Sequence, residues 1–135
     1  MAFNVKKCNV VSITNAKKNR QKYNYEMDGL PVKTIDSSPY LGVTINSKLQ
    51  WQQHIDAISG AANRMLGFLN RTLHRCPQKL KEKAYKTTVR PKLEYCSSIW
   101  DPRQQTNVVK IEMVQRRAAR FVKNIPHRYT GPQPW

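Results

Sequence analysis

The hydrophobic pattern of the chain changes near residue 51, from short strand-like runs to helical spacing. Asn9–Thr14 (NVVSIT) is a β-branched run, and Tyr23–Met27 (YNYEM) alternates until it reaches Asp28-Gly29. Because glycine tolerates a positive φ, Asp28-Gly29 predicts a tight hairpin turn, with Leu30–Ile35 as the return strand.

A further strand is predicted at Tyr40–Ile45, directly after Pro39. Gly42 lies in the middle of this run, where a glycine weakens a strand unless another backbone comes close. The pattern of the strand alone does not give the reason for Gly42.

A long amphipathic helix is predicted from Gln52 to Cys76-Pro77, because the residue before a proline is driven out of the helical region. Apolar residues recur along it at alternating spacings of three and four, the helical period. They are Ile55, Ile58, Ala62, Met65, Leu69 and Leu73. The opposite face carries Arg64, Arg71 and Arg75.

A second helix is predicted over roughly Gln78–Arg90, interrupted by Pro91. Its composition is dominated by Lys79, Lys81, Lys83 and Lys86. A short helix face is then predicted from Leu93, Cys96, Ser97 and Trp100, closed by Asp101-Pro102.

The last helix is predicted from about Gln104 to Ile125. Its apolar arc consists of Val108, Ile111, Val114, Ala118, Phe121 and Val122. A different arc carries Arg116, Arg120 and Lys123, with Arg117 at its edge.

These elements predict an α+β fold. Residues 1–50 form a short β-hairpin or sheet region, and residues 51–125 form a basic bundle of three to four helices. Residues 126–135 (PHRYTGPQPW) are expected to be an unstructured tail, because they hold three prolines and a glycine.

Charge points to a polyanionic partner. The chain has 24 Lys and Arg against 8 Asp and Glu, a net charge of +16. Residues 51–135 hold 16 of these cations and 5 of the acids, so most of the excess lies on the predicted helices. Neutralising phosphates releases their counterions, which favours nucleic-acid binding at low salt. The plainer interpretation is a solvated basic surface, since Arg and Lys are good helix formers on any exposed face.

The sequence offers little for catalysis. No metal-ligand spacing, phosphate-binding glycine loop, nucleophile elbow or pair of neighbouring carboxylates occurs, so we predict no catalytic residue, metal site or cofactor. No apolar run reaches the 18 or more residues of a membrane span, and we expect no membrane partner. The cysteines, Cys8, Cys76 and Cys96, are odd in number and far apart, which favours a reducing, intracellular location, nuclear or cytoplasmic.

Three stretches carry a resemblance: Tyr40–Trp51 (YLGVTINSKLQW), Val89–Trp100 (VRPKLEYCSSIW) and Glu112–Val122 (EMVQRRAARFV). Together with the FN-x-x-KC motif that ends in Lys7 and Cys8, they resemble in order and spacing the reverse transcriptases of non-LTR retrotransposons, especially the jockey-like and CR1-like lineages. The resemblance covers about residues 1–125.

The resemblance implies roles for several residues. Lys7 matches a family lysine that assists the chemistry near the incoming nucleotide, so it is an accessory candidate. Tyr40, Leu41 and Gly42 match the β-hairpin called the primer grip, which presses on the primer backbone. The resemblance thus implies a close approach of another backbone at Gly42. The helices from Gln52 onward match the thumb, whose basic faces follow an RNA–DNA duplex.

Two departures from the family's pattern limit what the resemblance implies for this chain. The Tyr-x-Asp-Asp strand that holds the catalytic magnesium ions of the full-length enzyme corresponds to a position upstream of Met1, and family members continue beyond the VQRRAAR helix. We therefore expect a non-catalytic primer-grip and thumb fragment of an RNA-directed DNA polymerase. The missing palm and fingers of the same enzyme are a further expected partner.

The predicted partner is an RNA–DNA hybrid or RNA, contacted at its phosphates without reading of the sequence. The predicted contacts are Tyr40, Leu41, Gly42, Arg64, Arg71, Arg75, Arg116, Arg120 and Lys123. Two alternatives remain open: a stand-alone basic protein of transposon origin that binds RNA or single strands, with Tyr23, Tyr25 and Tyr40 stacking on bases, or a relic without function.

Overall fold

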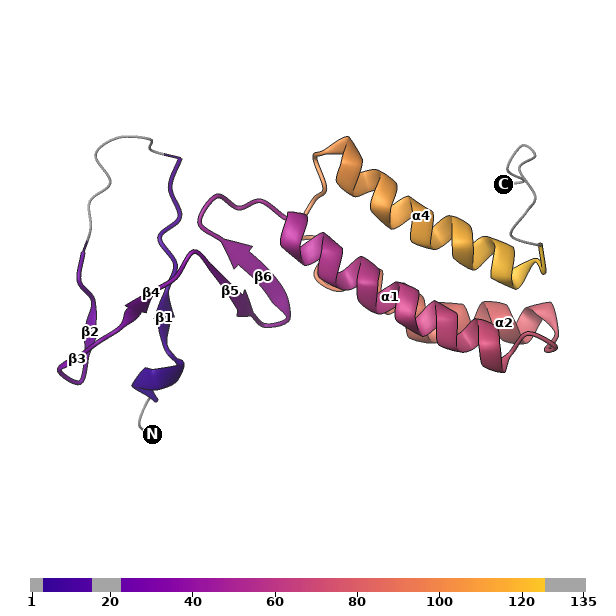
Figure 1. The fold of residues 1–135 in the computed structure, drawn as a ribbon, viewed down its shortest axis with the longest axis horizontal. Helices are drawn as coiled ribbons and strands as arrows, with labels where there is room; N and C mark the ends of the chain where they lie inside the picture. The colour runs from indigo at the N-terminus through magenta and orange to yellow at the C-terminus, as the bar shows by residue number, and fades with distance from the viewer. Residues whose placement is uncertain (1–3, 16–22, 126–135) are drawn as a thin grey trace. The chain divides into compact units, whose positions relative to one another are not determined.

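A computed structural model describes residues 4–15 and 23–125 of the chain. The chain divides into two compact units, Met1–His54 and Ile55–Trp135 (Figure 1). The described part of the first unit holds short strands, and that of the second holds helices, which confirms the α+β class. The predicted tail lies outside the described residues.

Within residues 4–15 and 23–54, the first unit contains three strand pairs and a 3-10 helix at Val5–Lys7. The strands are β1 (Asn9–Val10), β2 (Glu26–Met27), β3 (Leu30–Pro31), β4 (Lys33–Thr34), β5 (Ser37–Tyr40) and β6 (Val43–Asn46). β1 pairs with β4 in parallel, whereas β2–β3 and β5–β6 are antiparallel hairpins. The predicted return strand Leu30–Ile35 is thus split between β3 and β4.

Both hairpins close on a two-residue turn in which φ is positive twice. The values are 51° and 72° at Asp28-Gly29, and 47° and 81° at Leu41-Gly42, as a type I′ turn requires. The first turn confirms the prediction at Asp28-Gly29. The prediction of one continuous strand over Tyr40–Ile45 is wrong, because Gly42 is a turn residue selected for its positive φ and not for a close backbone contact within a strand.

The β5–β6 hairpin is joined to the first turn of the long helix through His54. His54 is 2 % exposed, and its Nδ1 accepts a hydrogen bond of 3.4 Å from the Thr44 N–H. Thr44 pairs with Pro39, next to the closing pair Tyr40 and Val43, so its N–H points away from the partner strand. Burial lowers the pKa of His54, because the imidazolium loses its hydration there.

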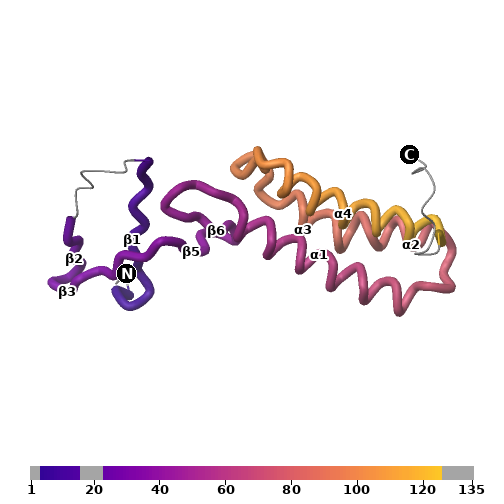
Figure 2. The backbone as a smooth tube through the Cα atoms, turned by 45° about the horizontal axis from the view of Figure 1, so that its top comes forward, coloured from indigo at the N-terminus to yellow at the C-terminus, as the bar shows by residue number. Residues whose placement is uncertain are grey.

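The second unit is a three-membered helical bundle. Its elements are α1 (Gln52–Thr72, whose first turn lies in the first unit), α2 (Gln78–Ala84), a π-helical stretch (Tyr85–Val89), α3 (Arg90–Glu94) and α4 (Gln105–Val122). Figure 2 shows residues 78–94 returning as one continuous helical segment beside α1, before α4 runs in the direction of α1 again.

Two predictions around Pro91 are wrong. Pro91 does not interrupt the helix, because it lies in the first turn of α3, where its missing N–H costs least, directly after the wider π-helical turns. The predicted helix face from Leu93 to Trp100 is also absent: α3 ends at Glu94, and Cys96 has a φ of 53°. Leu93 and Trp100 are nevertheless buried.

The core of the bundle follows the predicted apolar stripes. It consists of Ala62, Leu66, Leu69, Val89, Leu93, Val114, Ala118 and Phe121, with Met65, Leu73 and Val122 packed against it. Leu66 was not part of the predicted stripe, although it lies one residue from Met65 and widens the same arc.

The α1–α4 pair has a fixed parallel register. The ammonium of Lys110 pairs with Asp56, and the guanidinium of Arg117 donates to Asn63 Oδ1 at 3.0 Å. Both pairs join residues 54 apart in the chain, and they lie two helical turns from each other. α1 and α4 therefore run side by side in one direction (Figure 1).

Lys81 is the principal buried charge of the bundle. Its side chain is 1 % exposed, donates to the His74 carbonyl at 2.8 Å and to Asn124 Oδ1, and places Nζ 5.4 Å from the centre of the Phe121 ring. The prediction that grouped Lys81 with the lysines of a basic helix face is thus corrected. Lys81 therefore connects α2 to the segment that follows α1, through His74, and to the segment that follows α4, through Asn124.

Replacement of Lys81 tests this role. We expect Lys81→Ala to lower the free energy of unfolding by about 2–4 kcal/mol, because it removes a buried aliphatic stem and leaves two acceptors without their donor. Urea denaturation measures the change. Lys83→Ala removes an exposed lysine of the same helix and is the control. Equal stability of the two variants would contradict the assignment.

The buried His54 predicts a pH dependence. Unfolded histidine takes up a proton near pH ~6.5, whereas folded His54 resists protonation to lower pH, so between these values the unfolded state binds more protons. The free energy of unfolding should therefore fall as the pH drops from 7.5 to 5. Urea titrations should show that this fall in the free energy of unfolding is smaller in His54→Asn than in the unsubstituted chain. In His74→Asn, which replaces an exposed histidine, the fall should be unchanged.

Candidate nucleic-acid interface

The predicted arginines of α1 lie on one exposed face. Arg64 and Arg71 are seven residues apart, and within the described residues neither has an ion-pair partner. Each side chain lies back over a glycine one turn earlier: a Cβ built on Gly60 would meet Arg64 Nη1 at 3.5 Å, and one on Gly67 would meet Arg71 Nη1 at 3.6 Å. Both guanidinium groups are therefore held close to the helix surface and open to solvent.

Arg75 lies outside helix α1 and is therefore not part of its exposed arginine-bearing face. α1 ends at Thr72, and Arg75 is exposed in the connection that leads to α2. The helix stops four residues before Cys76-Pro77, and Leu73 and Cys76 are joined by a turn hydrogen bond of 3.0 Å. The helical position predicted for Arg75 is thus wrong.

The predicted cations of α4 differ from one another in setting. Arg116 is exposed and pairs with Glu112 at 3.0 Å, a surface ion pair that contributes little to stability. Lys123 is exposed at the C-cap of the helix, where a cation is favoured by the helix dipole. Arg120 is half-buried, and its Nε is enclosed with no acceptor among the described residues.

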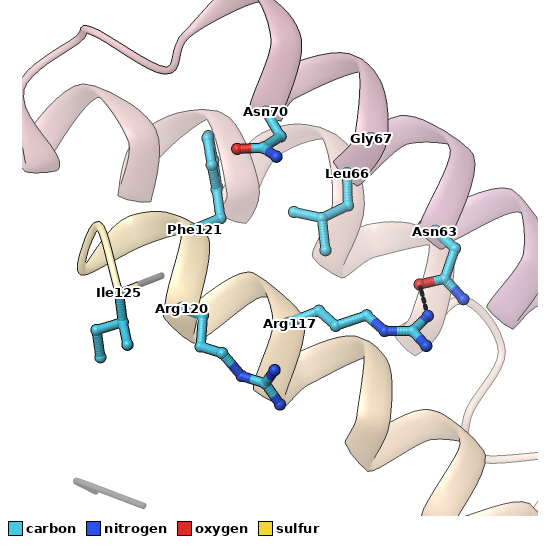
Figure 3. A pocket seen from close by; sticks show the side chains of 8 residues that line it. All are labelled: Asn63, Leu66, Gly67, Asn70, Arg117, Arg120, Phe121 and Ile125. Atoms are coloured by element: carbon cyan, nitrogen blue, oxygen red, sulfur yellow. Dashed lines mark hydrogen bonds between the residues drawn. The ribbon is translucent and has the colours of Figure 1, made fainter. Parts of the chain in front are cut away.

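A groove of about 320 Å³ runs between α1 and α4. Figure 3 shows the guanidinium of Arg117 reaching across it to Asn63, with Arg120 on the same helix one turn along. The groove is lined by Asn63, Leu66, Gly67, Asn70, Arg117, Arg120, Phe121 and Ile125, none of which is acidic. Because Gly67 lines the groove and Arg71 lies over Gly67, cations of both helices meet at one surface.

We call the surface formed by Arg64 and Arg71 of α1 and by Arg117 and Arg120 of α4 the arginine face. Arg71 lies over the groove-lining Gly67, whereas Arg64 lies two turns earlier on the same face of α1, outside the groove lining. The sequence placed Arg117 only at the edge of the cationic arc of α4. Arg117 follows Asn63 by 54 residues, as Lys110 follows Asp56. This equal spacing is the signal that could have found Arg117. Arg116 of α4 and Lys123 at the C-cap of α4 do not line the groove.

The predicted contact residues of the first unit lie at the tip of the β5–β6 hairpin. Tyr40 is 65 % exposed and Leu41 73 % exposed. Leu41 also adopts a φ of 47°, which a leucine rarely takes, whereas the equivalent turn position in the other hairpin is Asp28. The sequence thus keeps a large apolar side chain at an exposed and conformationally unfavourable position.

Lys7, the accessory candidate, ends the 3-10 helix Val5–Lys7 and is exposed. Asn4 caps this helix, since its Oδ1 accepts from the Lys6 N–H at 3.1 Å. Among residues 4–15 and 23–125, no three His, Cys, Asp or Glu side chains form a group that could hold a metal ion. In the same residues no helix combines the length and apolarity needed to cross a membrane.

Comparisons of the chain with protein-family profiles, with curated proteins and with solved structures found no match. The resemblance to reverse transcriptases rests on the sequence motifs alone.

The strained tip predicts a stabilising substitution. Leu41→Asn should raise the free energy of unfolding by about 0.5–1 kcal/mol, because asparagine followed by glycine suits a type I′ turn. Chemical denaturation measures the free energy of unfolding. Asp28→Asn is the control, and its effect should be small because aspartate already suits that turn position. A loss of stability in Leu41→Asn would show that the leucine packs in the folded unit and is not strained.

Proposed function

We propose that the chain binds the sugar–phosphate backbone of a nucleic-acid duplex through the arginine face, as the thumb region of a non-LTR retrotransposon reverse transcriptase would. The observation that supports this most is the meeting of α1 and α4 cations around a groove that has no acidic lining residue. Surface cations without local counter-charges are available to neutralise phosphates.

The spacing of the arginines suits a repeating polyanion. Seven residues of helix rise about 10.5 Å, so Arg64 and Arg71 are two turns apart along the axis. Each strand of a duplex carries one charge per ~3.4 Å of its axis, and the pair therefore spans about three nucleotide steps. Contacts of this kind orient a protein on a duplex without reading its sequence.

The hairpin tip supports a second contact of the same function. Tyr40 and Leu41 present apolar surface to solvent at a position where the turn itself would favour a small polar residue. A cost in local conformation at an exposed site is typical of residues kept for binding. In the proposed function this tip presses on the primer strand, and the chain holds the duplex without itself catalysing nucleotide addition.

One observation favours a second candidate function, the binding of single strands. Tyr23 and Tyr25 are both exposed, and their ring centres lie 6.3 Å apart at an interplanar angle of 55°. Exposed aromatic rings beside basic residues can stack on unpaired bases. Tighter binding of single-stranded RNA than of an RNA–DNA hybrid would favour this candidate over the duplex grip.

A salt titration tests the duplex grip. The logarithm of the affinity for an RNA–DNA hybrid should fall linearly with the logarithm of salt concentration, and in Arg64→Ala/Arg71→Ala the slope should decrease in magnitude by about 2, one released counterion for each lost phosphate contact. Fluorescence anisotropy measures the affinity.

The control variant is Lys79→Ala/Lys83→Ala. It removes the same charge from exposed positions two residues on either side of the buried Lys81, so both lysines face away from the core. Its slope should change by less than about 0.5. Equal losses in the two double variants would mean that binding follows net charge, and the arginine face would have no special role.

A further inference from the structure

The groove between α1 and α4 has the chemistry of a small-ligand site. It combines two guanidinium groups, two asparagine amides and an apolar wall, with no carboxylate among its described lining residues. Small-molecule sites are mostly apolar with a few convergent polar groups, and the groove volume of about 320 Å³ lies at the low end of their range.

Arg120 gives the site an unsatisfied donor. Its Nε is enclosed at the groove and meets no acceptor in the described part of the chain. An enclosed donor without a partner is unfavourable in a folded protein. Three other enclosed atoms of the described residues, in His54, Ser59 and Asn107, have no partner either. Arg120 is, however, the one of the four residues that lines the groove, where an acceptor from outside could reach it. An anionic oxygen suits a guanidinium best, because the charge-assisted bond is the stronger one.

Arg117 and Asn63 add polar groups to the groove without neutralising its charge. Arg117 Nη1 donates to Asn63 Oδ1 at 3.0 Å, a neutral acceptor, so the charge of this arginine also stays uncompensated (Figure 3). Arg117 and Arg120 are three residues apart on α4 and thus lie on neighbouring positions of one face. Two cations one turn apart can hold one phosphate between them.

The remaining lining residues suit the rest of a nucleotide. The apolar wall consists of the half-buried Ile125 and of the edges of Leu66 and Phe121, which are 6 % and 8 % exposed. A base could pack against this wall, and the exposed amide of Asn70 offers a donor and an acceptor for a base edge. A bare anion would need none of these groups, whereas an apolar ligand would not need the arginines.

We infer that the α1–α4 groove binds one nucleotide, with its phosphate at Arg117 and Arg120 and its base against Leu66 and Phe121. This deepens the proposed duplex grip, on which it rests, by assigning an unstacked or terminal nucleotide to a defined pocket beside the arginine face. A groove of about 320 Å³ is large enough for a single nucleotide.

The test is a titration of the full chain with adenosine 5′-monophosphate, followed by amide chemical shifts. We expect shifts at Asn70, Arg117 and Arg120, and at least tenfold weaker binding of inorganic phosphate alone and of adenosine alone. Inorganic phosphate that binds as well as the nucleotide would overturn the base contact, and adenosine that binds as well would overturn the phosphate contact.

Two glycines provide a matched pair of variants. Gly67→Leu places a side chain in the groove and should reduce nucleotide affinity at least tenfold, while Gly60→Leu, one heptad earlier beside Arg64 and outside the groove lining, should leave it unchanged. Leucine favours a helix more than glycine does, so loss of binding in Gly67→Leu would not arise from loss of helix. Equal binding in both variants would overturn the inference.

A second pair separates the groove from general charge. Arg120→Gln should lose nucleotide binding, and Arg116→Gln, on the same helix but outside the groove, should keep it. If the hybrid still binds with its salt dependence while the nucleotide does not, the inference fails and the duplex grip stands. Nucleotide binding without hybrid binding would instead support the groove and contradict the duplex grip.

Discussion

The parallel packing of α1 on α4 is the constraint on which the arginine face depends. Leu66 of α1 and Val114 and Ala118 of α4 belong to one buried cluster, which Val89 and Leu93 complete. The polar pair Asn63–Arg117 sets the register of the two helices at the rim. Had the helices slipped by one turn, Arg71 would no longer lie beside the groove that Arg120 lines. Apolar burial provides the stability, whereas the partly exposed polar pairs select one arrangement among several.

The amphipathic helices could be predicted from the sequence because their apolar residues follow a 3.6-residue period that tertiary packing then uses directly. The hairpin at Asp28-Gly29 could be predicted for a similar local reason. Three other features could not be predicted from the sequence. Lys81 is buried through partners seven and 43 residues away, Pro91 is accommodated by a π-helical stretch before it, and Arg117 joins the groove through a register between distant segments.

Two of the places where local rules are broken are also places proposed to bind. Leu41 stands where a turn would favour asparagine, and Arg120 keeps an enclosed donor without an acceptor among the described residues. Similar departures occur elsewhere in the described chain: Lys81 is a buried charge, Cys96 has a φ of 53°, and Asn107 Oδ1 is enclosed without a donor among the described residues. What sets Leu41 and Arg120 apart is their setting, at an exposed hairpin tip and at the groove.

The central claim is that nucleic acid meets the arginine face and not the basic surface in general. Titration of the chain with an RNA–DNA hybrid, observed through the Nε–Hε signals of its arginines, tests this most directly. We expect shifts at Arg64, Arg71, Arg117 and Arg120, and no shift at Arg90, which is paired with Glu94 on α3. Shifts of equal size at Arg90 and Arg103 would contradict the claim.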